Sequence, residues 1–145
     1  MSMELTVKRF GELTRDELYE ILRVRVAVFV VEQRCPYQEP DGMDQVAWHV
    51  FLHEDGAIRA YLRVFPAGAE TAAIGRVLTT RRGDGLGTRI LREGLAVARD
   101  RMGVRRVTLE AQVYAMGFYE RAGFRAVGEQ FLEDDIPHIR MELEL

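Results

Sequence analysis

Thr79 to Leu91 read TTRRGDGLGTRIL, and this stretch decides how the rest of the chain is interpreted. Two arginines lead into glycines at alternate positions, Gly83, Gly85 and Gly87, before an apolar rhythm resumes. A glycine turn that opens a helix leaves backbone N–H groups unpaired at the positive end of the helix dipole. Glycine also permits positive φ and a close approach of ligand to backbone. The stretch therefore predicts an anion site suited to a phosphate or pyrophosphate.

Two better known glycine motifs do not fit the stretch. The dinucleotide fingerprint G-x-G-x-x-G fails because residue 88 is Thr88, and the Walker pattern fails because the loop contains no lysine. The remaining pattern is R-x-x-G-x-G, from Arg82 to Gly87. Taken alone, this pattern fits a tight turn before an ordinary helix equally well.

Composition indicates one globular domain over residues 1–145, with 48% hydrophobic and 30% charged residues. The net charge of −3 argues against non-specific binding to nucleic acid. The first ten residues lack the apolar run of a signal peptide, and no run of about 18 apolar residues follows, which predicts a cytoplasmic protein without membrane association. Cys35 is the only cysteine, so we expect neither an intrachain disulfide nor a metal site.

The hydrophobic pattern predicts a mixed α/β fold. A capping box at Thr14 to Glu17 begins a helix that should run to about residue 32, and a polar loop follows over 34–44. A second helix should follow the glycines and end near Gly103, and a short third one should cover 114–123. Strands are expected at 4–10, 46–53, 57–65, 71–80, 105–111, 124–132 and 138–145. The order βαβββαβαββ predicts a mixed sheet of six to seven strands flanked by helices.

Two charged residues interrupt the apolar stripe of the first helix. Arg25 and Glu32 lie seven and fourteen residues after Leu18, on the same helical face. A charge on a core-facing stripe is costly unless it is paired or wet. For Arg25 we favour a structural role, in which it either extends to water at the helix edge or pairs with a structural partner. For Glu32, such a role and a place beside a polar pocket both stay open.

The motif Arg82–Gly87, placed between the fourth strand and a helix, resembles the acetyl-CoA-binding loop of the GNAT superfamily of acyltransferases. The segment FYERAGF (118–124) resembles part of the last helix of that superfamily. The segments RVAVFVVEQRCPYQEPDGMD (25–44) and DDIPHIRM (134–141) resemble its ElaA branch. One departure is a shorter connection between Gly75-Arg76-Val77 and the loop.

The resemblance implies an N-acetyltransferase that uses acetyl-CoA and acetylates a primary amine of a small molecule or peptide in a ternary complex. The strands that carry Leu78 and Glu110 should splay apart, and a backbone N–H of the fourth strand should polarise the thioester carbonyl. The cofactor-binding residues implied are Val77, Leu78 and Thr79 for the pantetheine arm, and Arg82, Gly83, Asp84, Gly85, Leu86, Gly87 and Thr88 for the pyrophosphate. Two alternatives stay open: a non-catalytic acyl-CoA-binding or sensing module on the same fold, and a phosphate-ligand domain unrelated to CoA.

Tyr119 matches the tyrosine that protonates the leaving thiolate in many relatives, although it could also be a packed aromatic. The general base is left open among Glu110, Glu32, His49 and His138, because each also has a structural interpretation.

The loop over 34–44 is the expected wall of the acceptor pocket. We expect Cys35, Tyr37, His49 and His138 to bind the acceptor, and Cys35 to line the pocket rather than act as a nucleophile. The terminal strands could supply an edge for association, so the protein is expected to be a monomer or a homodimer.

Overall fold

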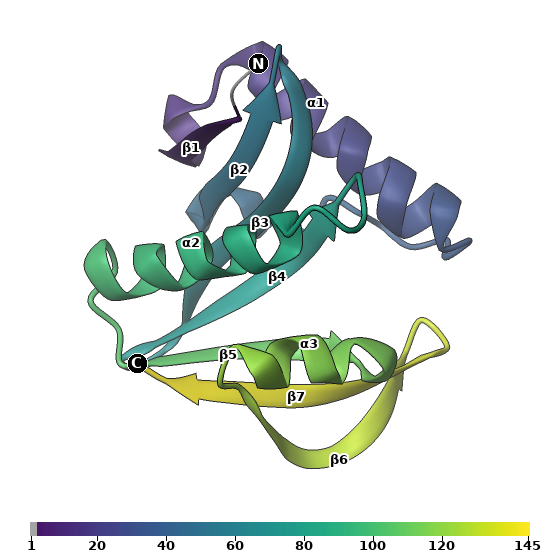
Figure 1. Ribbon diagram of the computed structural model, residues 1–145, viewed down its shortest axis with the longest axis vertical. Coiled ribbons are helices and arrows are strands. Elements are labelled where there is room, and N and C mark those ends of the chain that lie inside the picture. Colours follow the sequence, from purple (N-terminus) through teal and green to yellow (C-terminus); the bar gives the residue numbers. More distant parts are fainter. Residues whose placement is uncertain (1–2) are drawn as a thin grey trace.

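The computed structural model describes residues 3–145, which form one seven-stranded sheet with helices on both faces (Figure 1). The strands run β1-β2-β3-β4-β5-β7-β6 across the sheet. Their bounds are β1 Glu4–Arg9, β2 Trp48–Glu54, β3 Ala57–Gly68, β4 Thr71–Thr79, β5 Arg106–Gln112, β6 Arg125–Glu133 and β7 Ile136–Glu144. The main helices are α1 Arg15–Arg25, α2 Leu86–Asp100 and α3 Met116–Arg121. The expected element order and the mixed sheet are confirmed.

All neighbouring strands are antiparallel except β4 and β5, which are parallel. A parallel pair needs a long crossover, and α2 supplies it. Strands β1 and β6 lie at the two edges of the sheet. The strand–helix–strand unit expected around the glycine stretch is therefore the centre of the fold.

The two faces of the sheet are covered by different helices. Ile21 and Val24 of α1 pack against Phe51 and Tyr61 on one face. The larger apolar cluster lies on the other face, where α2 packs on the neighbours of those strand residues, such as Leu62. Successive strand residues point to opposite faces, so one strand can serve both clusters.

The first helix begins as predicted and then changes its geometry. Thr14 accepts a hydrogen bond from the Glu17 amide at 3.0 Å, and Glu17 accepts one from the Thr14 amide at 2.8 Å. After Arg25 the chain continues as a π-helical segment, Val26–Glu32, with bonds reaching back five residues, as from the Gln33 amide to the Val28 carbonyl. A wider turn advances each residue by a smaller angle, so positions after Arg25 leave the stripe set by α1.

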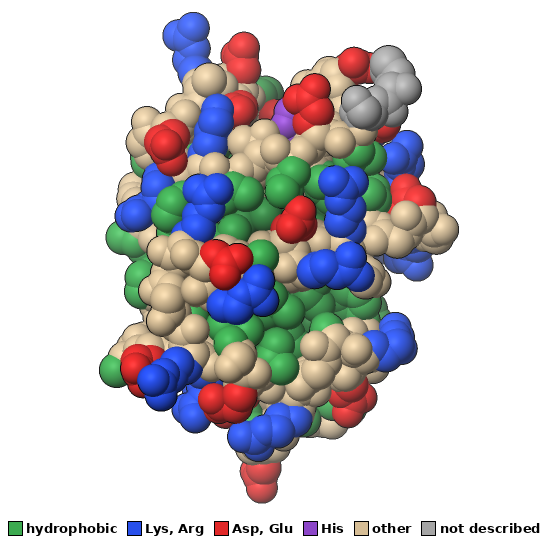
Figure 2. All heavy atoms as spheres, turned by 60° about the vertical axis from the view of Figure 1, so that its left-hand side comes forward, with side chains coloured by type: hydrophobic (Ala, Val, Ile, Leu, Met, Phe, Trp, Pro, Cys, Tyr) green, Lys and Arg blue, Asp and Glu red, His purple; other side chains and the backbone are tan. Residues whose placement is uncertain are grey.

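Charged side chains of both signs are interspersed on the face shown in Figure 2. This mixture is consistent with a chain that has 20 basic and 23 acidic residues. Among residues 3–145, no helix has the length and apolar character needed to cross a membrane.

Candidate active site

Strands β4 and β5 are paired at one end and then part (Figure 1). Their pairing covers three positions and stops at Ala73 and Thr108, although both strands continue beyond. A cavity of about 760 Å³ lies at this fork, lined by both strands, the 34–44 loop, α3 and the β6–β7 turn. A fork of this kind exposes strand backbone to a ligand, which an uninterrupted sheet cannot do.

The glycine loop forms the start of α2. Gly83 and Gly85 have φ of 81° and 74°, in the left-handed region, and Gly85 is the residue before the helix. Gly85 has no side chain that could cap the helix. The Leu86 amide makes one long contact, of 3.4 Å, to Oδ1 of Asp84. In the part of the chain described, the amides of the next two residues donate to no side chain.

The loop residues fit a bound pyrophosphate. A side chain added at Gly83 or Gly85 would meet no atom within 4 Å, so the space above the loop is open. A side chain added at Gly87 would lie 3.4 Å from Phe118, so this glycine permits α2 to lie close to α3. Arg82 is exposed beside the loop, whereas Arg81 pairs with Asp84 at 3.2 Å and with Glu54 at 3.5 Å.

The three strand residues expected beside the pantetheine arm have different surroundings. Val77 lines the cavity. Leu78 is buried on the α1 face, packed with Tyr61, so only its backbone can face a ligand in the fork. Thr79 is half-buried and lies close to Gly87, at the transition from strand to loop.

Tyr119 lines the cavity from α3. Its ring packs edge-on against Phe118 and Phe124, and its hydroxyl makes no hydrogen bond to any residue in the described range 3–145. Burial raises the pKa of Tyr119 to about 12, with a smaller contribution from Tyr114. The hydroxyl is therefore protonated at neutral pH and available as a donor.

Glu110 and His138 meet at the β5–β7 side of the cavity, together with Glu133. Partial burial raises the pKa of Glu110, and the nearby Glu133 carboxylate adds to the effect. His138 Nδ1 lies 2.7 Å from the Ile136 carbonyl, which can only accept, so this nitrogen carries the hydrogen. Nε2 lies 3.7 Å from a Glu133 carboxylate oxygen, so the two carboxylates and the imidazole form one polar cluster at this side of the cavity.

Cys35 and Tyr37 also line the cavity, from the loop over 34–44. Burial raises the pKa of the Cys35 thiol, and the acidic residues Asp134 and Asp135 raise it further. A thiol is a nucleophile only as the thiolate, so this environment favours a pocket wall. The Tyr37 hydroxyl donates to Glu39 at 3.1 Å, which fixes the ring at the cavity.

His49 and Glu32 are not brought to the cavity, which corrects the expectation that they serve the site. His49 is fully buried on β2, between the Tyr61 hydroxyl at 2.7 Å and the Asp44 carbonyl at 2.9 Å. Burial lowers the pKa of His49, so it is a neutral core residue. Glu32 is exposed at the end of the π-helical segment, because the wider turn rotates it off the stripe of α1.

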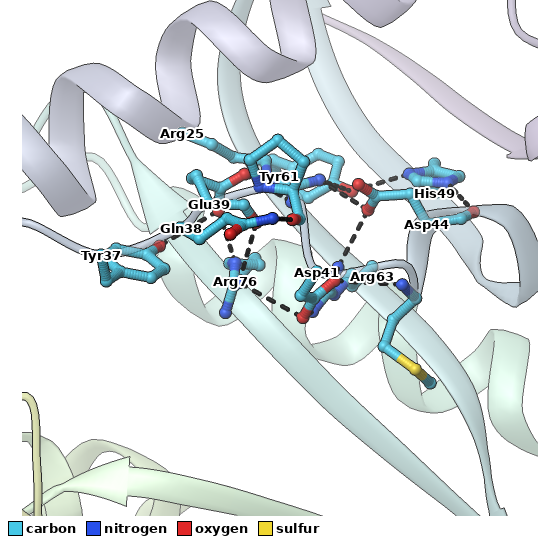
Figure 3. A network of polar contacts seen from close by, with 12 residues as sticks. Arg25, Tyr37, Gln38, Glu39, Asp41, Asp44, His49, Tyr61, Arg63 and Arg76 are labelled. Carbon is cyan, nitrogen blue, oxygen red and sulfur yellow. Dashed lines mark hydrogen bonds and ion pairs between the residues drawn. The ribbon is translucent and has the colours of Figure 1, made fainter.

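Three arginines and three carboxylates form a closed ring of ion pairs beside the cavity (Figure 3). In order around the ring they are Arg25, Glu39, Arg76, Asp41, Arg63 and Asp44, with neighbours 2.5 to 3.3 Å apart. The ring joins α1, the 34–44 loop, β3 and β4. The sequence left two structural roles open for Arg25, an extension to water or a pairing, and it did not indicate the ring.

Four of the six ring members are buried, Asp41 and Arg76 lie at its open side, and the charges balance. Arg25 is 0% exposed, and Arg63 and Glu39 are each 3% exposed. Burial alone would raise the pKa of Asp41, but bonds from Arg63 and from the Met43 amide outweigh it and lower the value to about 2. The arginines likewise lower the pKa of Asp44, so both aspartates of the ring are charged at neutral pH.

Comparison with known proteins agrees with this geometry. A family model described as "Acetyltransferase (GNAT) domain" matches residues 20–145. A UPF0039 protein of Schizosaccharomyces pombe is 36% identical over 99% of both chains. The crystal structure of Escherichia coli ElaA has 35% identity and a TM-score of 0.92, covering 97% of this chain and 99% of that one. An acyl-CoA N-acyltransferase from Pseudomonas aeruginosa has 42% identity and a TM-score of 0.93, covering 98% and 99%. The chain belongs to the GNAT family of acetyltransferases, in the branch represented by ElaA.

Proposed function

We propose that the protein is an acetyl-CoA-dependent N-acetyltransferase that acts on a primary amine of a small molecule or peptide. The observation that carries the proposal is the fork between β4 and β5. It brings a protonated Tyr119 and the acidic group around Glu110 to one cavity, and the glycine turn that opens α2 lies beyond the cavity lining, against Phe118, the neighbour of Tyr119.

The backbone of the glycine loop binds the diphosphate through the amides at the start of α2, and Arg82 adds positive charge. The strand backbone around Val77 pairs with the amide groups of the pantetheine arm. Acetyl-CoA supplies an acetyl group activated as a thioester. A backbone N–H of β4 that faces the thioester oxygen stabilises the negative charge that develops there.

The acceptor must attack as a free amine, whose conjugate acid has a pKa of about 10.4 for a lysine-like group. Glu110 accepts the proton that the amine loses, directly or through one water. The new bond joins the amine nitrogen to the acetyl carbon, and the carbon–sulfur bond breaks. Tyr119 donates its hydroxyl proton to the departing sulfur.

The test combines cofactor binding with turnover. At a ligand concentration of about 100 times Kd, binding to the folded state stabilises a protein by about 2.7 kcal/mol. We therefore expect acetyl-CoA to raise Tm, and a panel of amines to reveal acceptor-dependent release of free thiol. Absence of a Tm shift at millimolar acetyl-CoA would refute the proposal. Cofactor binding without thiol release across a broad panel would favour the non-catalytic module instead.

A further inference from the structure

Strand β4 contains a bulge at the fork. On β3, Tyr61 and Arg63 are two residues apart, whereas their partners on β4, Leu78 and Gly75, are three apart. The extra residue gives Arg76 a φ of 54°, in the left-handed region. Inside a strand, a residue with a side chain adopts this conformation at a cost in free energy, which contacts of that side chain can offset.

The surroundings that hold Arg76 are in the 34–44 loop. Its Nε lies 2.5 Å from Glu39 Oε2, and its Nη2 donates to the Glu39 carbonyl at 3.1 Å and to Asp41 at 3.3 Å. Its guanidinium also lies 5.2 Å from the centre of the Tyr37 ring. Four contacts thus fix one side chain against one loop, and the planar guanidinium of arginine, with its fixed donor directions, is suited to such a role.

The loop itself cannot yield easily, because the other ring members anchor it. Arg25 binds Glu39 and Asp44, and Arg63 binds Asp41 and Asp44. A buried charge that loses its partner has no water to replace it. The contacts that fix Arg76 are therefore connected to α1 through the ion pairs of Arg25, and to β3 through those of Arg63.

The bulge lies where the proposed chemistry takes place. Gly75, Arg76 and Val77 line the cavity, just beyond Ala73, the last position at which β4 pairs with β5. A backbone donor that stabilises a developing negative charge must be placed to within about 0.5 Å. The direction of the N–H groups in this segment depends on the conformation of Arg76.

We propose that Arg76 is a positioning residue, which the ion-pair ring uses to fix the backbone of the β4 bulge for acyl transfer. This inference rests on the proposed function and goes beyond it, because it assigns a role to residues that do not react. The ring acts mainly on the rate of the chemical step, whereas the glycine loop contributes most of the affinity for the cofactor and the strand backbone around Val77 contributes the smaller part.

Two variants separate positioning from stability. Arg76→Lys keeps the positive charge but loses the planar guanidinium and its several donors. Arg76→Gly loses the side-chain contacts but adopts positive φ freely, which offsets part of the loss in folding stability. The matched controls are Arg105→Lys, at an exposed arginine paired with Glu70, and Glu70→Gly, which relieves a φ of 54° in the β3–β4 turn.

The measurements are kcat and KM for acetyl-CoA, Kd for CoA, Tm, and amide hydrogen exchange of residues 75–78. For both Arg76 variants we expect kcat to fall at least tenfold and exchange at 75–78 to quicken at least tenfold. We expect KM and Kd to stay within threefold of wild type, and both controls to match wild-type kcat.

Several outcomes would overturn the inference. These are kcat within twofold of wild type, a loss of CoA affinity in proportion to kcat, or failure of both Arg76 variants to fold where Glu70→Gly folds. A wild-type protein that neither binds CoA nor turns over refutes the proposed function instead. Hydrogen exchange in the same variants then still decides whether Arg76 holds the bulge.

Discussion

Replacing Arg25 with methionine removes one of the three positive charges from a buried ring. Glu39 and Asp44 each keep one arginine, but the ring changes from neutral to a net charge of −1, and the uncompensated charge lies at its buried end, where Glu39 is 3% exposed. Breaking a buried pair by removing one partner costs about 3–5 kcal/mol. For a chain of this size, each kcal/mol lowers Tm by about 4 °C, so we expect a fall of about 12–20 °C.

The matched control is Arg23→Met, two residues earlier on the same helix. Arg23 pairs with Glu20 at 2.7 Å, but its side chain is 55% exposed. An exposed pair of this kind contributes about 0.3–0.5 kcal/mol. Urea unfolding followed by circular dichroism gives both values, and the first should exceed the second several-fold.

A double-mutant cycle sharpens the test. Adding Glu39→Gln to Arg25→Met restores a neutral set of two arginines and two aspartates, so the double variant should be more stable than the sum of the single effects predicts.

The Arg25→Met variant should also lose less stability, relative to wild type, as pH falls. The reason is that Asp44 loses Arg25, one of the two arginines that hold its pKa below the usual value, so less of its stabilising effect is left to be lost on protonation. A loss below about 1 kcal/mol for Arg25→Met, or strict additivity in the cycle, would refute the ring as a coupled unit.

Three further variants test the site and the packing around it. Tyr119→Phe should lower kcat about tenfold or more with Kd for CoA unchanged, because the general acid is lost but the ring remains; an unchanged kcat would remove Tyr119 from this role. Glu110→Gln should lower kcat/KM about 10²-fold and abolish its rise with pH on the acidic side, as seen in a pH–rate profile. The folded-state pKa of Glu110 is raised, so its charged form opposes folding above that pKa, and the same variant should be slightly more stable than wild type at pH 7 and equal to it in acid. Gly94→Val should destabilise by at least about 1–3 kcal/mol in urea unfolding, because an added Cβ lies 2.8 Å from Leu62 in the core, whereas Gly11→Ala, with no atom within 4 Å, should not.

Local patterns predicted the elements of this fold well. The capping box at Thr14 and the alternation along the strands report interactions between residues close in sequence, and both were confirmed. The glycine stretch was placed correctly at the start of α2, because its geometry is set by the residues themselves.

The errors have physical causes that no local pattern reports. Glu32 left its expected face because the helix widens after Arg25. His49 lies on the face of the sheet that α1 covers. The Asp44 carbonyl takes up its Nε2, so the imidazole is enclosed in a polar part of the core and does not reach a pocket. The ring joins residues 14 to 37 positions apart, from Arg25 and Glu39 to Arg76 and Glu39, so nothing in either segment alone indicates the pairing.

The short pairing between β4 and β5 has a consequence for handling the protein. Within residues 3–145, the strand pairing between the two halves of the sheet covers three residue pairs, from Thr71 opposite Arg106 to Ala73 opposite Thr108, beside the bonds that the Glu70 carbonyl accepts from Arg105 and Arg106. A molecule bound in the cavity beyond these pairs contacts both halves of the sheet and stabilises their relative position. Purification with the donor thioester or free CoA present should therefore yield protein that resists protease nicking longer than protein stripped of it.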